Sequence, residues 1–106
     1  MEYQEEKKNG KEEGFGILFF VSGKFKGDRY EGELRNGEFC GKAMYYHATG
    51  NRFEGDYKND YRNGKGIFYW LNGNWREGEY KDGNKHGKSI HHFADGQIEE
   101  QIWENN

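Results

Sequence analysis

Hydrophobic and polar residues alternate along several short segments of the chain. Residues 52–58 show this most clearly, because Phe53, Gly55 and Tyr57 occupy every second position and charged residues stand between them. Successive side chains of a β-strand point to opposite faces, so the pattern predicts a strand with one apolar and one charged face. A helix would need apolar residues three and four positions apart. The pattern therefore predicts strands.

Glycine recurs at intervals of 23 residues, and similar residues surround it each time. Three series have this spacing: Gly32, Gly55 and Gly78; Gly41, Gly64 and Gly87; and Gly50, Gly73 and Gly96. An earlier copy that begins at Tyr3 is four residues longer, at 24–27, and a half-copy containing Trp103 ends the chain. Self-similarity at a period of about 20–50 residues indicates a repeat architecture. The sequence thus contains four repeats and a terminal strand.

Each repeat is predicted to form a β-hairpin. Asn-Gly at 36–37 and Asp-Gly at 82–83 supply the positive φ that tight hairpin turns require. We expect the second strand to begin at the Gly-Lys step and to carry large side chains in columns. These columns are Ile17, Met44, Ile67 and Ile90; Phe19, Tyr46, Tyr69 and His92; and Phe20, His47, Trp70 and Phe93. A glycine inside a strand permits close approach, so each glycine of the first series should make a slot for a ring of the adjacent hairpin.

The composition indicates what could form a core. The mean hydropathy is -1.32 and 33% of the residues are charged, which is typical of a disordered chain. Aromatic residues, however, make up 18% of the chain, and each ring can bury about 150–250 Å². A single hairpin is not stable alone, so stacking of the repeats must bury the rings between neighbours. Nine strands about 4.8 Å apart would give a sheet roughly 40 Å long.

Length and charge exclude several classes of protein. The 106 residues allow one domain, and the net charge of -3 with interspersed signs argues against nucleic-acid binding. The longest apolar run, 17–21, is far shorter than the roughly 20 residues that span a bilayer, and we expect no signal peptide. Cys40 is the only cysteine, so no internal disulfide can form. These features predict a cytoplasmic protein.

The repeat resembles the MORN repeat (membrane occupation and recognition nexus). The likeness is strongest at 53–58, Phe-Glu-Gly-Asp-Tyr-Lys, and at 64–69, Gly-Lys-Gly-Ile-Phe-Tyr, and it extends from Tyr3 to Trp103. The sequence departs from the repeat in four ways: the insertion at 24–27, Glu5 and Gln101 in place of glycine, and Arg76 in place of a ring.

The resemblance implies an all-β fold, an elongated single-layer antiparallel sheet of stacked hairpins with a shallow groove. A single domain should span 1–106, with repeats at about 3–29, 30–52, 53–75 and 76–98 and a capping half-repeat at 99–106. Similar proteins are scaffolds of cilia, flagella, cytoskeletal assemblies and membrane junctions, and they also flank lipid kinases and methyltransferases. Their groove commonly holds a helix or an extended peptide of a partner.

Exposed rings are the main candidates for contact with such a protein partner. A thin sheet cannot bury both faces of every second strand, and a contiguous exposed apolar patch indicates a partner site. The predicted partner-binding residues are Phe20, Tyr45, His47, Phe68, Trp70, His91 and Phe93. The alternative is that these rings only fill the concavity of the sheet.

One lysine per repeat forms a basic row: Lys42, Lys65 and Lys88. The row could contact lipid phosphates or an acidic partner. It could also be a solvated surface that pairs with Glu31, Glu54 and Glu77 on neighbouring strands. The second interpretation is favoured, because electrostatic membrane capture usually needs about 4–8 clustered basic residues.

No catalytic, metal-binding or cofactor-binding group of residues is evident. His91 and His92 are adjacent in a strand and must point to opposite faces, so they cannot chelate one ion together. Cys40 has no evident partner that would activate it, and Glu99 and Glu100 also face opposite ways. We expect no enzyme activity, no metal and no cofactor.

The sequence therefore predicts a non-catalytic scaffold or adaptor that binds a helix or extended segment of a protein in an aromatic-lined groove. A ciliary, flagellar or cytoskeletal assembly is the expected setting. The alternatives are a membrane-associated module that binds acidic phospholipids and a regulatory segment of a larger enzyme. The end strands near Tyr3 and Trp103 could also pair two copies as a homodimer, which the neighbouring acids would oppose: Glu5, Glu6, Glu99 and Glu100.

Overall fold

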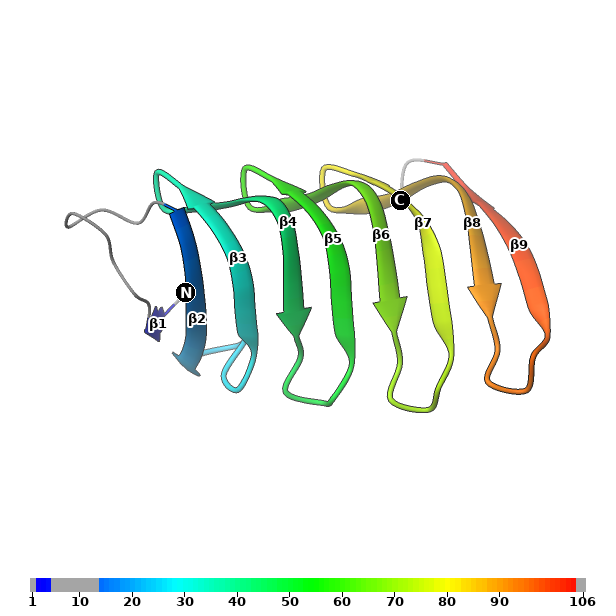
Figure 1. The fold of residues 1–106 in the computed structure, drawn as a ribbon, viewed down its shortest axis with the longest axis horizontal. Helices are drawn as coiled ribbons and strands as arrows, with labels where there is room; N and C mark the ends of the chain where they lie inside the picture. The colour runs from blue at the N-terminus through cyan, green and yellow to red at the C-terminus, as the bar shows by residue number, and fades with distance from the viewer. Residues whose placement is uncertain (1, 5–13, 105–106) are drawn as a thin grey trace.

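A single antiparallel sheet makes up the described part of the protein (Figure 1). The computed structural model describes residues 2–4 and 14–104. The nine strands follow one another across the sheet in chain order, and the molecule measures 47 × 24 × 21 Å. The strands are β1 (Glu2–Gln4), β2 (Gly14–Ser22), β3 (Arg29–Arg35), β4 (Glu38–Tyr46), β5 (Arg52–Lys58), β6 (Tyr61–Tyr69), β7 (Trp75–Lys81), β8 (Asn84–His92) and β9 (Ile98–Trp103). The predicted elongated single-layer sheet of stacked hairpins is confirmed.

No helix long and apolar enough to cross a bilayer occurs in the described part of the chain. Glu5 and Glu6, which we expected to protect one edge of the sheet, lie outside the described residues. Glu99 and Glu100 are exposed in β9, at the opposite edge.

Two-residue turns close the three central hairpins. The turn residues are Asn36-Gly37, Asn59-Asp60 and Asp82-Gly83, and all six have positive φ. Positive φ at both central positions matches the right-handed twist of the flanking strands, which favours Asn, Asp and Gly here. Because the turns are this short, β4, β6 and β8 begin three residues before the Gly-Lys step. The predicted start of these strands was therefore wrong.

The glycines of the Gly-Lys steps are β-bulges. Gly41, Gly64 and Gly87 have φ of 66°, 93° and 71°. The register of each hairpin shifts beside them, and the bulged strand contains the extra residues. A bulge bends its strand, and Figure 1 shows β4, β6 and β8 running sideways from their turns before they bend into the body of the sheet.

The two faces of the sheet differ in kind. One face, which we call the ring face, carries the core: Leu18, Phe20, Tyr30, Leu34, Phe39, Ala43, Tyr45, Phe53, Tyr57 and Tyr80. Tyr30 stacks on Phe39 with centroids 3.7 Å apart, and Tyr57 packs edge-on against both rings. These contacts join residues on both sides of the bend, so the rings hold each hairpin in its bent shape. We call the opposite face the groove face.

A row of small residues crosses the sheet beneath the rings. The register aligns Gly16, Gly32, Ala43, Gly55, Gly66, Gly78 and Ser89. The ring of Phe53 lies directly over Gly55 and Gly66. The predicted glycine slot thus exists, but the ring that fills it comes from the same hairpin and not from the adjacent one. Phe53 and Gly55 are two residues apart in β5, so both positions lie on the same face of the sheet. The Phe53 ring is therefore already placed over Gly55.

The slot can be tested with two alanine substitutions. The nearest atoms to a Cβ at Gly66 would belong to the Phe53 ring and, at 3.4 Å, to Tyr80. A Cβ at Gly55 would also lie 2.7 Å from the Gly66 Cα and 2.8 Å from the Lys65 carbonyl oxygen. We expect Gly66→Ala to lower the free energy of unfolding by roughly 1–3 kcal/mol, and Gly55→Ala by at least as much.

Urea unfolding in a Phe53→Leu background distinguishes the effect of Gly66→Ala from that of Gly55→Ala. In this background Gly66→Ala should lower the free energy of unfolding very little. Gly55→Ala should still lower it, because the backbone atoms beside Gly55 cannot move aside as a side chain can. Equal costs of Gly66→Ala in both backgrounds would contradict the placement of Phe53.

Candidate functional site

The seven predicted partner-binding residues lie together on the ring face. Their rings form a continuous series of contacts across the strands. The centroid distances are Phe20–Tyr45 5.9 Å, Tyr45–His47 4.8 Å, His47–Phe68 5.7 Å, Phe68–Trp70 4.8 Å, Trp70–His91 5.0 Å and His91–Phe93 4.5 Å. We call this series the ring ladder.

Burial divides the ring ladder. Phe20 and Tyr45 are only 2% and 8% exposed, so these two belong to the core and not to an accessible contact surface. The four-residue insertion covers Phe20, because Phe25 packs edge-on against it with centroids 6.1 Å apart. The other five rings of the ladder are half-buried. Any partner of the ladder must therefore contact its C-terminal part.

Asp28 organises a buried polar cluster under the insertion. The Tyr45 hydroxyl donates to Asp28 Oδ2 at 2.6 Å, and the Ala48 backbone N–H donates to Oδ1 at 2.8 Å. Burial, followed by the hydrogen bond to Asp28, raises the pKa of Tyr45 well above its usual range. His47 lies 3.9 Å from the same carboxylate and 3.5 Å from Arg62. Burial lowers the pKa of His47; Asp28 opposes this shift and Arg62 adds to it.

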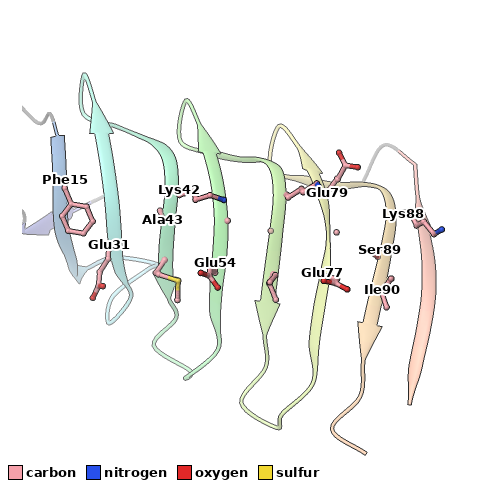
Figure 2. Close-up of a pocket in the computed structure, with 16 residues that line it drawn as sticks. Phe15, Glu31, Lys42, Ala43, Glu54, Glu77, Glu79, Lys88, Ser89 and Ile90 are labelled. Carbon is pink, nitrogen blue, oxygen red and sulfur yellow. The ribbon is translucent and has the colours of Figure 1, made fainter. Parts of the chain in front are cut away.

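A groove of about 760 Å³ crosses the groove face from β2 to β8 (Figure 2). Its apolar side chains are Phe15, Met44, Ile67 and Ile90, and its floor is formed by Ala43, Gly55, Gly66, Gly78 and Ser89. Figure 2 shows two charged rows beside this floor. One contains Glu31, Glu54 and Glu77, and the other contains Lys42, Glu79 and Lys88. None of the seven rings of the ladder lines the groove.

Each lysine of the basic row lies beside the groove, but their acidic neighbours are not the expected ones. Lys42 Nζ lies 3.7 Å from Asp56, and Lys88 Nζ lies 3.0 Å from Glu100. Lys65 stands opposite Glu79 in the register. The predicted pairing with Glu31, Glu54 and Glu77 is therefore wrong. Both ion pairs are exposed, so each contributes only about 0–1 kcal/mol.

The groove was not predicted as a site, although the sequence contained a signal for it. Met44, Ile67 and Ile90 were recognised as a column, and each directly precedes a residue of the ring ladder. Adjacent strand residues face opposite ways, so this column had to lie on the other face of the sheet. Its half-buried aliphatic side chains alternate with glutamates along one row: Ile17, Glu31, Met44, Glu54, Ile67, Glu77, Ile90 and Glu100.

Within the described residues, no group of three or more His, Cys, Asp or Glu side chains could hold a metal ion. His92 lies 3.2 Å from Glu77 on the groove face, while the neighbouring His91 stands in the ring ladder. Cys40 is half-buried and forms no disulfide. The absence of enzyme activity stays a prediction.

Fold and sequence together define the class of protein, a single-layer repeat protein built from β-hairpins. The family profile described as MORN repeat matches residues 6–25, 30–52, 53–75 and 77–98. The chain therefore belongs to the MORN repeat family. Such repeats are typical of proteins that take part in membrane or protein interactions. A search of curated proteins finds no significant match to the chain.

The half-buried histidine His47 makes stability depend on pH. Because the pKa of His47 in the folded protein lies below the value of about 6.5 for an unfolded chain, unfolding takes up a proton between the two values. The free energy of unfolding should therefore decrease as the pH falls below about 6.5. Urea titrations at several pH values should show a smaller decrease for His47→Gln. The exposed His86→Gln variant is the control, and an identical slope for His47→Gln and wild type would refute this assignment.

Proposed function

We propose that this protein is a non-catalytic scaffold that holds a helix or an extended segment of a partner protein in the groove of the groove face. The observation that carries the proposal is the groove itself, which is apolar, crosses most of the sheet and lies on the face opposite the core. The groove lined by the rings of the ladder, which the sequence predicted, is thus replaced by one lined with Phe15, aliphatic side chains and glycine backbone.

The dimensions of the groove suit a helical segment. From Phe15 on β2 to Ile90 on β8 there are six strand spacings of about 4.8 Å, or roughly 29 Å, which is the length of a helix of about 19 residues. Met44, Ile67 and Ile90 stand on every second strand, about 9.6 Å apart. One heptad of a helix rises about 10.5 Å, so apolar side chains seven residues apart would reach successive aliphatic side chains.

The charged rows support the same occupant. Acidic side chains on one flank of the segment would face Lys42, Lys65 and Lys88, and basic side chains on the other flank would face the glutamates. Phospholipid binding is less well supported, because Lys42 and Lys88 already pair with acids. The cytoplasmic, cytoskeletal or ciliary setting is part of the proposal and rests on family membership alone. Homodimer formation through the sheet edges stays a prediction.

The test compares three tagged variants as bait for proteins of the host cell. Met44→Glu/Ile67→Glu places charge in the groove, Ile98→Glu places charge on the same face beyond it, and Trp70→Ala/Phe93→Ala removes two rings of the opposite face. We expect a protein that binds through the groove to be lost from the groove variant and retained by the Ile98 variant, whereas a protein lost only from the ring variant would bind the ring face. Ile67→Glu should then raise the dissociation constant of the isolated partner segment at least roughly tenfold, because residues at the centre of an interface contribute most to binding.

Two outcomes would contradict the proposal. One is retention of every captured protein by the groove variant. The other is that the protein captures no protein partner but floats with phosphatidylserine vesicles in a manner that depends on Lys42, Lys65 and Lys88.

A further inference from the structure

Two columns of the ring face change from rings to cations toward the C-terminus. Tyr30 and Phe53 are fully buried rings, and the next repeat has Arg76 at the same position, 7% exposed. Phe39 is likewise buried, and the two following repeats have Arg62 and Lys85 in its place. We call Arg62, Arg76 and Lys85 the cation cluster. These residues replace core positions and are not scattered over the surface.

The cation cluster lies among aromatic rings around Tyr80. The Arg62 guanidinium is 4.2 Å from the Phe53 centroid and 5.7 Å from that of Tyr80. Arg76 donates to the Tyr80 hydroxyl at 3.0 Å and lies 5.2 Å from the Trp70 centroid. Lys85 Nζ is 4.1 Å from the Trp103 centroid. The rings hold these side chains by cation–π contact but supply no negative charge.

In the described part of the chain, no carboxylate lies within ion-pair distance of the cation cluster. Among residues 14–104, no ion pair within 4.0 Å involves Arg62, Arg76 or Lys85. Glu99, which the register places on this face, accepts a hydrogen bond from Gln101 at the exposed edge. Burial lowers the pKa of Lys85, and the charges of Arg76 and Arg62 lower it further. A desolvated charge without a counter-charge is costly, so an incoming anion would relieve an existing cost.

A half-buried histidine at the same place offers a further hydrogen-bonding group. His91 stands directly opposite Arg76 in the register, between the rings of Trp70 and Phe93. Its Nε2 atom is buried and has no hydrogen-bond partner within the described structure. Buried polar groups are nearly always hydrogen-bonded, and this ring nitrogen beside a buried cation can hydrogen-bond a polar group of an incoming segment.

We propose that the ring face of the last two repeats binds an acidic segment of a protein partner. Carboxylates of the segment pair with the cation cluster, and an adjacent apolar side chain of the segment packs on Trp70 and Phe93. The occupant is a peptide and not a membrane, because Arg76 is recessed among rings where a flat bilayer cannot reach it. This site faces away from the groove, so the scaffold can hold two segments on opposite faces.

Blocked pentapeptides provide the probe: acetyl-Glu-Asp-Leu-Asp-Glu-amide, its Phe-centred version, and matched Asn/Gln peptides without charge. The full chain is titrated with each peptide while the indole N–H signals of Trp70 and Trp103 are followed by NMR. We expect salt-sensitive shifts with the acidic peptides only. Absence of binding by both acidic peptides at millimolar concentration would overturn the proposal.

Two triple variants that remove equal charge from opposite faces give the matched comparison. Arg62→Gln/Arg76→Gln/Lys85→Gln should weaken acidic-peptide binding at least roughly tenfold, as loss of several charge-assisted contacts requires. Lys42→Gln/Lys65→Gln/Lys88→Gln should leave it unchanged. Equal loss in both variants would show non-specific attraction, and phosphatidylserine vesicles that bind through the cation cluster would show that the source of the anion is a membrane. Either result overturns the proposal.

A variant with the ring of the preceding repeat at position 76 shows whether a loss of peptide binding is caused by unfolding. Arg76→Phe should raise the melting temperature, because it removes a buried uncompensated charge, and it should weaken peptide binding. A lower melting temperature with undiminished binding would show that Arg76 is a structural residue and would overturn the proposal.

Discussion

The structure depends on rings that lie directly on glycine backbone. A one-layer sheet has no second layer to pack against, so its core must be formed on its own surface. Phe53 covers Gly55 and Gly66, and Tyr30 covers Gly32 in the same way. The absence of side chains at these glycines lets each ring lie close to the sheet, where rings from both sides of the bend meet. The core thereby forms on the ring face, and the groove lies on the opposite face.

The ring face is itself uneven along its length. At the N-terminal end, the insertion at 24–27 and Asp28 cover Phe20 and Tyr45. Toward the C-terminus, cations replace core rings and the ladder becomes half-buried. Terminal repeats of a stacked array contact a neighbour on one side only, so they are free to diverge from the others. Sequence divergence in the C-terminal repeats replaces rings of the ring face with cations, while the strand register and the turns stay regular.

Much of the fold could be predicted from the sequence, because a strict period identifies every residue that shares a position. The hairpins, the positive-φ turns and the clustering of the ring ladder follow from the period and from strand alternation. Strand alternation also identified the face on which the column of Met44, Ile67 and Ile90 lies, but the acidic neighbours of the lysines could not be derived in this way. Bulges at Gly41, Gly64 and Gly87 shift the register within each hairpin, and Lys42 and Lys88 lie beside Asp56 and Glu100. The burial of Phe20 could not be predicted from the period either, because the insertion that packs on Phe20 occurs in one repeat only.

The central claim is that the rings lie on the glycine floor, and proton NMR tests it directly. A ring face shifts the signals of protons beneath it upfield. We expect upfield Hα signals for Gly66 and Gly55, beneath Phe53, and ordinary strand values for Gly78, whose nearest neighbours are Ser89 and backbone. The upfield shifts should disappear in Phe53→Leu. Ordinary Hα values at Gly66 that do not depend on Phe53 would contradict the account.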